Sequence, residues 1–193
     1  SSALAVSAFY VAMMLIAERL LRNGIAIAMA CVGAFGALLW AWSMTLTDGD
    51  TFSVLVAVLD TQFWLSTHVV CISIGYSASF AAGAFGLAWI CCAMAGSRFD
   101  TGTRRTLSNI IYGITCFALF FSFFGTVLGG LWGDDSWGRF WGWDPKENGA
   151  LMIVLWNAVV LHARWAGIAR QRGIAILAVL GIFLFGQAVE GNV

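Results

Sequence analysis

Residues 109–147 read NIIYGITCFALFFSFFGTVLGGLWGDDSWGRFWGWDPKE. The first part, residues 109–131, carries no charge and is long enough to cross a bilayer, because a spanning helix needs roughly 20 apolar residues. The second part, residues 132–147, holds four tryptophans, four acidic residues, two cations and the only proline of the chain. This junction predicts a membrane-spanning helix that runs into a tryptophan-rich loop, and we expect the function to lie in that loop.

The rest of the chain repeats the apolar part of this pattern. Of its 193 residues, 61% are hydrophobic and only 10% are charged, and the mean hydropathy is +0.87. Six apolar stretches are candidate spans: residues 1–17, 25–46, 63–95, 109–131, 150–165 and 174–189. The sequence therefore predicts an all-α, polytopic transmembrane bundle of about six spanning helices, with the tryptophan-rich loop outside the membrane.

Internal repeats and linkers are absent from the sequence, so we expect a single domain over residues 1–193. The chain opens directly in an apolar stretch, without the basic segment that begins a signal peptide. We therefore expect this domain to be incomplete at one or both ends.

Charged residues divide between two sets of connecting segments. The arginine-rich set contains Arg19, Arg22, Arg98, Arg104, Arg105, Arg164, Arg170 and Arg172, against Glu18 and Asp100. The acidic set contains Asp48, Asp50, Asp60, Asp134, Asp135, Asp144, Glu147 and Glu190, against Arg139 and Lys146. Because arginine-rich segments stay in the cytoplasm, the tryptophan-rich loop is expected on the external side. Topology accounts for the basic residues, and we expect no nucleic-acid partner.

Cysteine chemistry is not expected from this chain. All five cysteines lie within apolar stretches, and none forms a C-x-x-C pair. Buried cysteine usually acts as a small packing residue. Gly125, Gly129 and Gly133, at four-residue spacing, predict a close contact between two helices.

The end of the tryptophan-rich loop has the pattern of a helix start. Asp144, Pro145 and Glu147 stand at the N-cap, first and third positions of the next apolar stretch. Proline is favoured at the first position, and the two carboxylates can bond the free amides reciprocally. We expect Asp144 and Glu147 to be helix caps.

The tryptophans of the loop need a separate explanation. An interfacial aromatic belt is the simpler interpretation, because tryptophan is enriched at membrane surfaces. A belt does not require glycines between Trp137, Trp141 and Trp143, however, and these glycines allow a flat partner to approach the backbone. On a helical turn Trp137 and Trp141 would share a face. The alternative is therefore a surface for a large planar apolar ligand.

The motif W-G-R-F-W-G-W-D-P-K-E, with Trp132 before it and residues 161–164 (LHAR) after it, resembles the WWD signature of haem-handling membrane proteins of the cytochrome c assembly family. The resemblance is greatest to the CcsA/ResC type, which is related to CcmC and CcmF. A second stretch, residues 63–76, resembles the family segment that holds the first external histidine, here His68.

The resemblance implies a function in cytochrome c biogenesis. Haem b would be bound as a substrate and presented at the external face for thioether attachment to apocytochrome c. Implied partners are haem, apocytochrome c, the lipid bilayer and a companion membrane synthase subunit of the ResB/CcsB type. The implied location is the bacterial cytoplasmic membrane, with the loop on the periplasmic side. Whether the chain forms part of a holocytochrome c synthase (haem lyase) stays open.

By the same resemblance, His68 is the first axial ligand of the haem iron, and the loop forms the haem platform. The implied platform and frame are Trp132, Trp137, Trp141, Trp143 and Asp144. Helix arithmetic agrees for His68: residues 63–95 would extend about 50 Å, against a hydrocarbon core of roughly 30 Å. His68 would then stand beyond the hydrocarbon edge, on the side of the loop.

Two external cations, Arg139 and Lys146, are candidates for the haem propionates, because charge-assisted bonds hold carboxylates strongly. The equal alternative is that each pairs with Asp134, Asp135 or Glu147.

The family also has a second external histidine, after the helix that follows the WWD segment. The chain contains only His68 and His162, and His162 lies towards the cytoplasmic end of its apolar stretch. Further chain beyond Val193, a different mode of haem binding and a lost activity all stay open, and ligation by two histidines is not inferred.

Two other classes of function remain. The chain could be a haem-free structural subunit of a larger membrane complex that keeps the motif as a scaffold. It could also be a small-molecule permease, for which charged residues within the spans would be expected. The candidate spans contain almost none.

Overall fold

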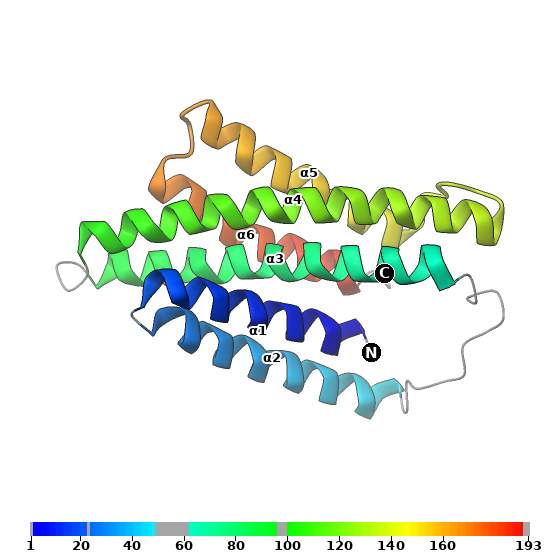
Figure 1. Cartoon of the computed structure of the whole chain (residues 1–193), viewed down its shortest axis with the longest axis horizontal. Helices are drawn as coiled ribbons and strands as arrows, with labels where there is room; N and C mark the ends of the chain where they lie inside the picture. Colours follow the sequence, from blue (N-terminus) through cyan, green and yellow to red (C-terminus); the bar gives the residue numbers. More distant parts are fainter. Residues whose placement is uncertain (1, 23, 49–61, 96–99, 191–193) are drawn as a thin grey trace.

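The computed structural model describes residues 2–22, 24–48, 62–95 and 100–190, and all regular structure in these ranges is helical (Figure 1). The helices are α1 (Ser2–Leu21), α2 (Ile25–Asp48), α3 (Gln62–Met94), α4 (Thr101–Trp137), α5 (Pro145–Trp165) and α6 (Gln171–Glu190). The expectation of an all-α chain with six helices is confirmed for the residues described. The number of helices that cross a membrane stays a prediction.

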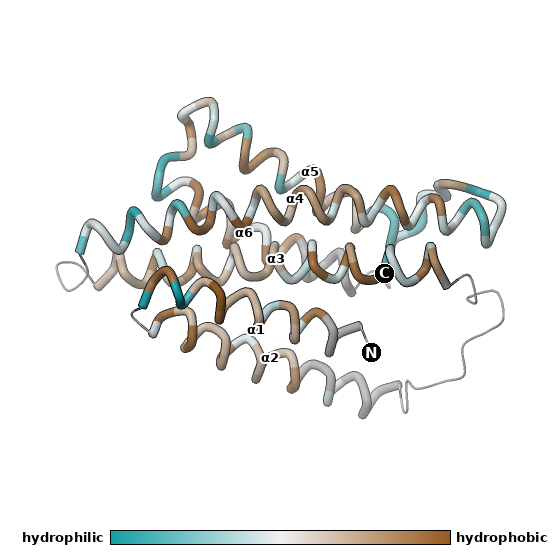
Figure 2. The backbone as a smooth tube through the Cα atoms, viewed as in Figure 1, coloured by the Kyte–Doolittle hydropathy of each residue, from teal (hydrophilic) through white to brown (hydrophobic). Residues whose placement is uncertain are grey.

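Within the described ranges, two helices are long and apolar enough to be candidate membrane spans. They are α3, over Phe63–Met94, and α4, over Thr101–Trp137. The central helix is α3, which packs against α1, α4 and α6, and most of its apolar stretch is buried inside the bundle. Helix α4 keeps a phenylalanine-rich side exposed, including Phe120 and Phe123. Figure 2 shows the hydrophobic residues continuing along both helices.

Small residues bring α3 and α4 into backbone contact. The two helices run antiparallel, and a Cβ added at Gly75 would lie 2.6 Å from the backbone nitrogen of Ser122. A Cβ added at Gly125 would lie 2.8 Å from the backbone nitrogen of Ile72. Neither position therefore accepts a side chain without moving a helix. The predicted close helix contact is confirmed at Gly125, and its partner is α3.

Buried polar side chains link the helices at a few points. The amide of Asn157 on α5 donates to the hydroxyl of Ser79 on α3, with an N–O distance of 3.0 Å. The indole of Trp156 donates to the carbonyl of Leu177 on α6. Since buried polar groups are costly unless they are bonded, these contacts fix which faces of the helices meet.

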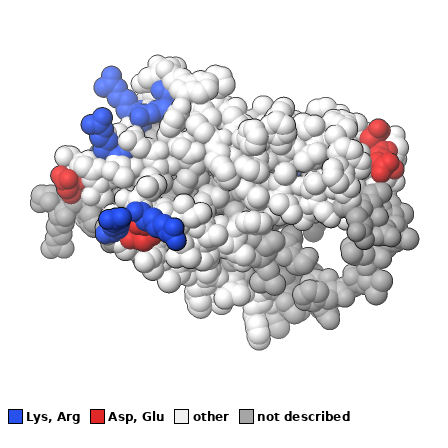
Figure 3. Space-filling model, in the orientation of Figure 1, with Lys and Arg blue, Asp and Glu red and all other residues white. Residues whose placement is uncertain are grey.

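Charged residues gather at opposite ends of the bundle (Figure 3). The arginine end is where α1, α3 and α5 finish and α4 and α6 begin, and its described arginines are Arg19, Arg22, Arg104, Arg105, Arg164, Arg170 and Arg172. The tryptophan end is where α3 begins, α4 finishes and α5 begins. It carries Asp134 and Asp135, among other charges, while Arg98, Asp50 and Asp60 lie outside the described residues.

Helix α4 is longer at both ends than the apolar stretch predicts. It begins at Thr101 instead of residue 109 and ends at Trp137 instead of residue 131. Trp132 and Trp137 therefore belong to the helix, and the expectation that both lie in the loop is wrong. Hydrophobic length marks where a helix can meet lipid, whereas the helix itself continues until Gly138 adopts the left-handed conformation, with φ of 68°.

Replacing Gly125 by alanine should destabilise the bundle. The added methyl group meets the backbone of α3, and overpacking of this kind costs about 1–3 kcal/mol. Thermal unfolding of the detergent-solubilised protein measures the effect. Gly113→Ala is the matched control on the same helix, because nothing lies within 4 Å of a Cβ there. Equal melting temperatures for the two variants would contradict the contact.

Candidate functional site

The first turn of α5 is closed by a reciprocal pair of carboxylates. The Asp144 side chain accepts a hydrogen bond from the backbone N–H of Glu147 at 2.9 Å, and the Glu147 side chain accepts from the backbone N–H of Asp144 at 3.4 Å. Pro145 occupies the first helical position. The predicted capping role of Asp144 and Glu147 is confirmed.

Glu147 also organises the residues before the helix. Its carboxylate accepts the backbone N–H of Gly142 at 2.6 Å and a guanidinium N–H of Arg139 at 3.4 Å. Arg139 lies 3.9 Å from the Asp144 carboxylate as well, and its guanidinium fills the space that a side chain at position 142 would need. The sequence left two alternatives for Arg139, a haem propionate or a neighbouring carboxylate. In the structure Arg139 pairs with the carboxylate of Glu147 and, at a longer distance, with that of Asp144.

Trp143 has a backbone conformation that is unfavourable for a bulky residue. Its φ is 60°, in the left-handed region that costs an L-residue roughly 1–2 kcal/mol. Asn148 holds this turn, because its side-chain amide donates to the Trp143 carbonyl at 3.0 Å. The turn leaves the Trp143 side chain 70% exposed. Backbone strain of this kind is concentrated at functional sites.

His68, on α3, packs against α4 at the tryptophan end. Its Nδ1 is 2.7 Å from the carbonyl oxygen of Gly125, and since a carbonyl can only accept, Nδ1 carries the proton. In the neutral ring Nε2 then keeps its lone pair. Gly129 provides the room, because a Cβ there would lie 2.6 Å from Cε1 of the imidazole. The ring is partly buried and held in one orientation.

The aromatic residues form two groups. His68 is parallel to Trp132, with ring centroids 6.4 Å apart and an angle of 5° between planes, and Trp132 meets Trp137 edge to face at 6.4 Å. In the loop, Trp141 and Trp143 pair edge to face at 6.0 Å. The expectation that Trp137 and Trp141 share a helical face is wrong, because α4 ends at Trp137.

Two polar atoms near the end of α4 lack partners in the described part of the chain. The indole nitrogen of Trp132 and the hydroxyl of Ser136 are buried, and neither makes a hydrogen bond. They stand one helical turn apart on α4. A buried donor without an acceptor costs about 1–3 kcal/mol, so an acceptor supplied by a ligand would be stabilised at this position.

Lys146 and His162 stand apart from these contacts. Lys146 is exposed and makes no ion pair within the described residues. His162 is exposed near the arginine end of α5, with Nδ1 2.7 Å from the carbonyl of Ala158. The described residues contain no group of three or more metal-ligating side chains.

A family model described as cytochrome C assembly protein matches residues 1–186. The chain belongs to this family. The resemblance inferred from the WWD motif is therefore confirmed, and with it a context in cytochrome c biogenesis. The matched region includes His68, the whole of α4 and the loop before α5.

Curated members of the cytochrome c assembly family resemble parts of the chain. Protein NrfI of Wolinella succinogenes is 33% identical over 147 residues, which is 72% of this chain and 15% of that protein. The cytochrome c biogenesis protein CcsA of Nostoc punctiforme is 42% identical over 77 residues, 40% of this chain and 22% of that protein. CcsA of Prochlorococcus marinus is 35% identical over 78 residues, 40% of this chain and 25% of that protein. The chain thus spans a quarter or less of each relative's length.

Two contributors to this site were not identified from the sequence as its members. Gly125 and Gly129 were interpreted as packing residues, whereas the structure also gives them the carbonyl and the space that orient His68. The four-residue glycine spacing was the available signal. The spacing could not have shown which residue of α3 faces these glycines, because the register between two helices depends on how they pack and not on the sequence of either helix alone.

Asp144→Ala should loosen the start of α5, whereas Asp144→Asn should not, because asparagine is an equally good N-cap. Loss of the cap costs about 1 kcal/mol. Hydrogen exchange of the amides over residues 142–149 reports the change, with Lys146→Ala as a control in the same turn. If the amides were equally protected in the wild type, the alanine variant and the asparagine variant, the Asp144 cap would not be needed.

Proposed function

We propose that this chain is the haem-presenting membrane part of a cytochrome c assembly protein. It binds haem b at its tryptophan end, with His68 as an iron ligand, and presents it for attachment to apocytochrome c. The observation that supports this most is the His68 ring, whose Nδ1 is bonded to Gly125 and whose Nε2 is left with its lone pair beside the WWD segment.

The bundle is proposed to lie in the bacterial cytoplasmic membrane as a single domain of six spanning helices. Large apolar side chains are exposed along it, such as Phe35 on α2, Phe120 on α4 and Phe183 on α6, each more than half exposed. Lipid would cover these surfaces. The separation of arginines from the tryptophan end supports a cytoplasmic arginine end and a periplasmic tryptophan end.

His68 fits the requirements of an iron ligand in two respects. Imidazole is a common axial ligand of haem iron, and the second nitrogen of a ligating histidine usually donates to a carbonyl or carboxylate. Here Nδ1 donates to the Gly125 carbonyl, so Nε2 would be the ligating atom. The Nδ1 bond also makes the ring a stronger donor to the metal.

The exposed aromatic residues suit a flat apolar substrate. Trp137, just before Gly138 in the sequence, is 60% exposed, and Trp143, after it, is 70% exposed. The porphyrin would cover apolar surface that otherwise faces water. Trp132 pairs edge to face with Trp137, and Trp141 pairs in the same way with Trp143, so both would support the platform. Asp144 would hold the edge of the platform in place because it caps α5.

The propionates need donors that the loop has not already used. Arg139 is paired with Glu147 and Asp144, which leaves Lys146 as the external cation without an ion pair in the described part of the chain. We therefore assign Lys146 the larger part in holding a propionate and Arg139 the smaller. The Trp132 indole and the Ser136 hydroxyl are further donors that await an acceptor.

The chemical step joins haem to the partner cytochrome. Each thiol of the C-x-x-C-H motif adds across a haem vinyl group, the sulfur forming a thioether bond to carbon while the thiol proton goes to the other vinyl carbon. This chain would contribute binding and orientation, since correct positioning alone lowers such a barrier substantially. A ResB/CcsB-like subunit would complete the synthase, and apocytochrome c would be the acceptor.

A haem-free structural role is the second candidate. The capping box and the Arg139–Glu147 pair satisfy the loop without any ligand, which is what a scaffold requires. The strained Trp143 and the partnerless donors at Trp132 and Ser136 favour the haem role instead, because a scaffold gains nothing from either.

His68→Gly should abolish or weaken the Soret band of the haem-loaded, detergent-purified protein, and added imidazole should restore it. Free imidazole fits the space left by the side chain and replaces the ligand, a rescue that a structural histidine would not give. Val69→Ala, at the neighbouring exposed position, is the control. If the wild type binds no haem, even after haem is added, the proposed haem role would be wrong and the structural role would remain.

Gly129→Ala should disturb the haem spectrum while His68 itself is unchanged. The new methyl group would meet the imidazole at Cε1 and turn the ring away from the Gly125 carbonyl. Gly113→Ala, which meets nothing, is the control on the same helix. An unchanged Soret position in Gly129→Ala would mean that the ring orientation does not matter for haem.

A further inference from the structure

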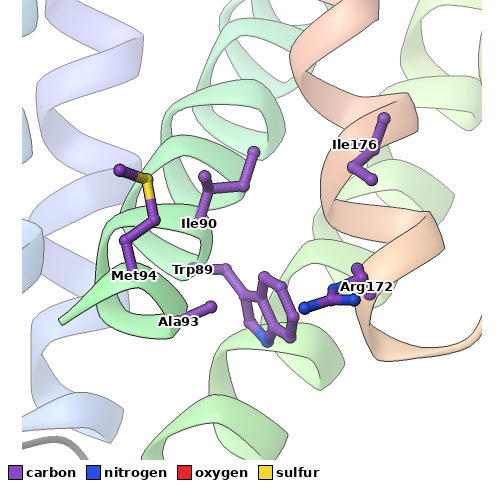
Figure 4. A pocket seen from close by; sticks show the side chains of 6 residues that line it. All are labelled: Trp89, Ile90, Ala93, Met94, Arg172 and Ile176. Carbon is purple, nitrogen blue, oxygen red and sulfur yellow. The ribbon is translucent and has the colours of Figure 1, made fainter. Parts of the chain in front are cut away.

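A pocket of about 370 Å³ lies between α3 and α6 at the arginine end, away from His68 (Figure 4). Its lining is apolar except for one cation: Trp89, Ile90, Ala93, Met94, Ile176 and Arg172. This volume falls within the range of roughly 300–1,000 Å³ that small-ligand sites occupy. None of these residues belongs to the tryptophan end.

The pocket begins where the close contact between the two helices stops. A Cβ added at Gly86 would lie 2.7 Å from the carbonyl oxygen of Ala175, so α3 and α6 touch there. Towards the arginine end, Trp89 on α3 is buried while Ile176 on α6 is 45% exposed. The apolar wall thus continues from the core to the surface of the bundle, as an acyl chain would require.

Two arginines lie next to Trp89. Figure 4 shows the Arg172 side chain extending from α6 towards the indole ring. Arg104 on α4 contacts the same tryptophan: its carbonyl accepts the indole N–H of Trp89 at 3.0 Å, while its own Nε is buried without an acceptor. Neither arginine forms an ion pair with a carboxylate in the described residues.

The arginine end as a whole carries an excess of positive charge. Its seven described arginines face only Glu18 and Asp100, and the Glu18 carboxylate already accepts the backbone N–H groups of Gly24 at 2.7 Å and Ala26 at 3.1 Å. Anions from outside the described chain would balance the remaining positive charge. An occupant that also covers the apolar wall of the pocket has to join an anionic group to a hydrocarbon.

We propose that this pocket binds an anionic phospholipid of the leaflet at the arginine end. The phosphate lies on Arg172, with Arg104 near it, and one acyl chain follows Ile90, Ala93 and Ile176. The proposal rests on the membrane placement given under Proposed function and not on haem binding. A second pocket, of about 570 Å³ between α1 and α4, has no charged lining residue and so would not select a headgroup.

Quenching of Trp89 by lipids with brominated acyl chains tests the site in the full chain reconstituted into nanodiscs. Bromine quenches an indole on contact, and the Trp89 signal is the difference between the wild type and Trp89→Phe. Brominated phosphatidylglycerol should quench this signal at a lower mole fraction than brominated phosphatidylcholine. Arg172→Gln should raise the half-quenching fraction of phosphatidylglycerol about fivefold, the effect of one interfacial cation.

Two control variants and two further measurements make the outcome decisive. Arg172→Lys should keep most of the preference, and Arg19→Gln, with the same charge change on α1, should keep all of it. Equal quenching by the two lipids, or equal losses in Arg19→Gln and Arg172→Gln, would overturn the proposal. Relief of quenching by excess inorganic phosphate would assign the site to a free anion instead. Haem absorbance of Arg172→Gln separates this result from the proposed function, because it should match the wild type.

Discussion

The close antiparallel contact between α3 and α4 is the constraint on which the rest of the site depends. Gly75 and Gly125 let the two backbones touch, and this fixes the register in which Gly129 lies over His68. The histidine, which precedes the WWD motif by more than sixty residues, is thereby placed beside Trp132 and bonded to a backbone carbonyl. Without the glycines the ring would have neither the space nor the acceptor.

The loop after α4 combines rigidity with strain. Glu147 caps α5, binds the amide of Gly142 and pairs with Arg139, so one carboxylate holds three partners. These bonds stabilise a turn in which Trp143 stays in the left-handed region with its ring towards solvent. Exposing tryptophan side chains to water in this way costs an isolated protein free energy, whereas the same surface can bind a flat apolar substrate.

Composition and motif predicted the helices, the capping box and the family, because each of these depends on residues that are close together in the sequence. Apolar runs predicted the helices, D-P-K-E predicted the capping box, and the WWD string predicted the family. The extent of α4 was not predictable from hydrophobicity, since the helix continues through polar residues to Gly138. The contacts of His68 were not predictable either, because helix register depends on packing across the whole α3–α4 interface.

The most direct test is nitrogen NMR of the detergent-solubilised protein labelled with ¹⁵N-histidine, which contains only His68 and His162. The account predicts that the His68 ring carries its proton on Nδ1, and that the Nε2 resonance of His68 shifts or broadens when haem is added. A His68 ring protonated on Nε2 that is unaffected by haem would contradict the account, because the Gly125 bond and the ligating lone pair would both be absent.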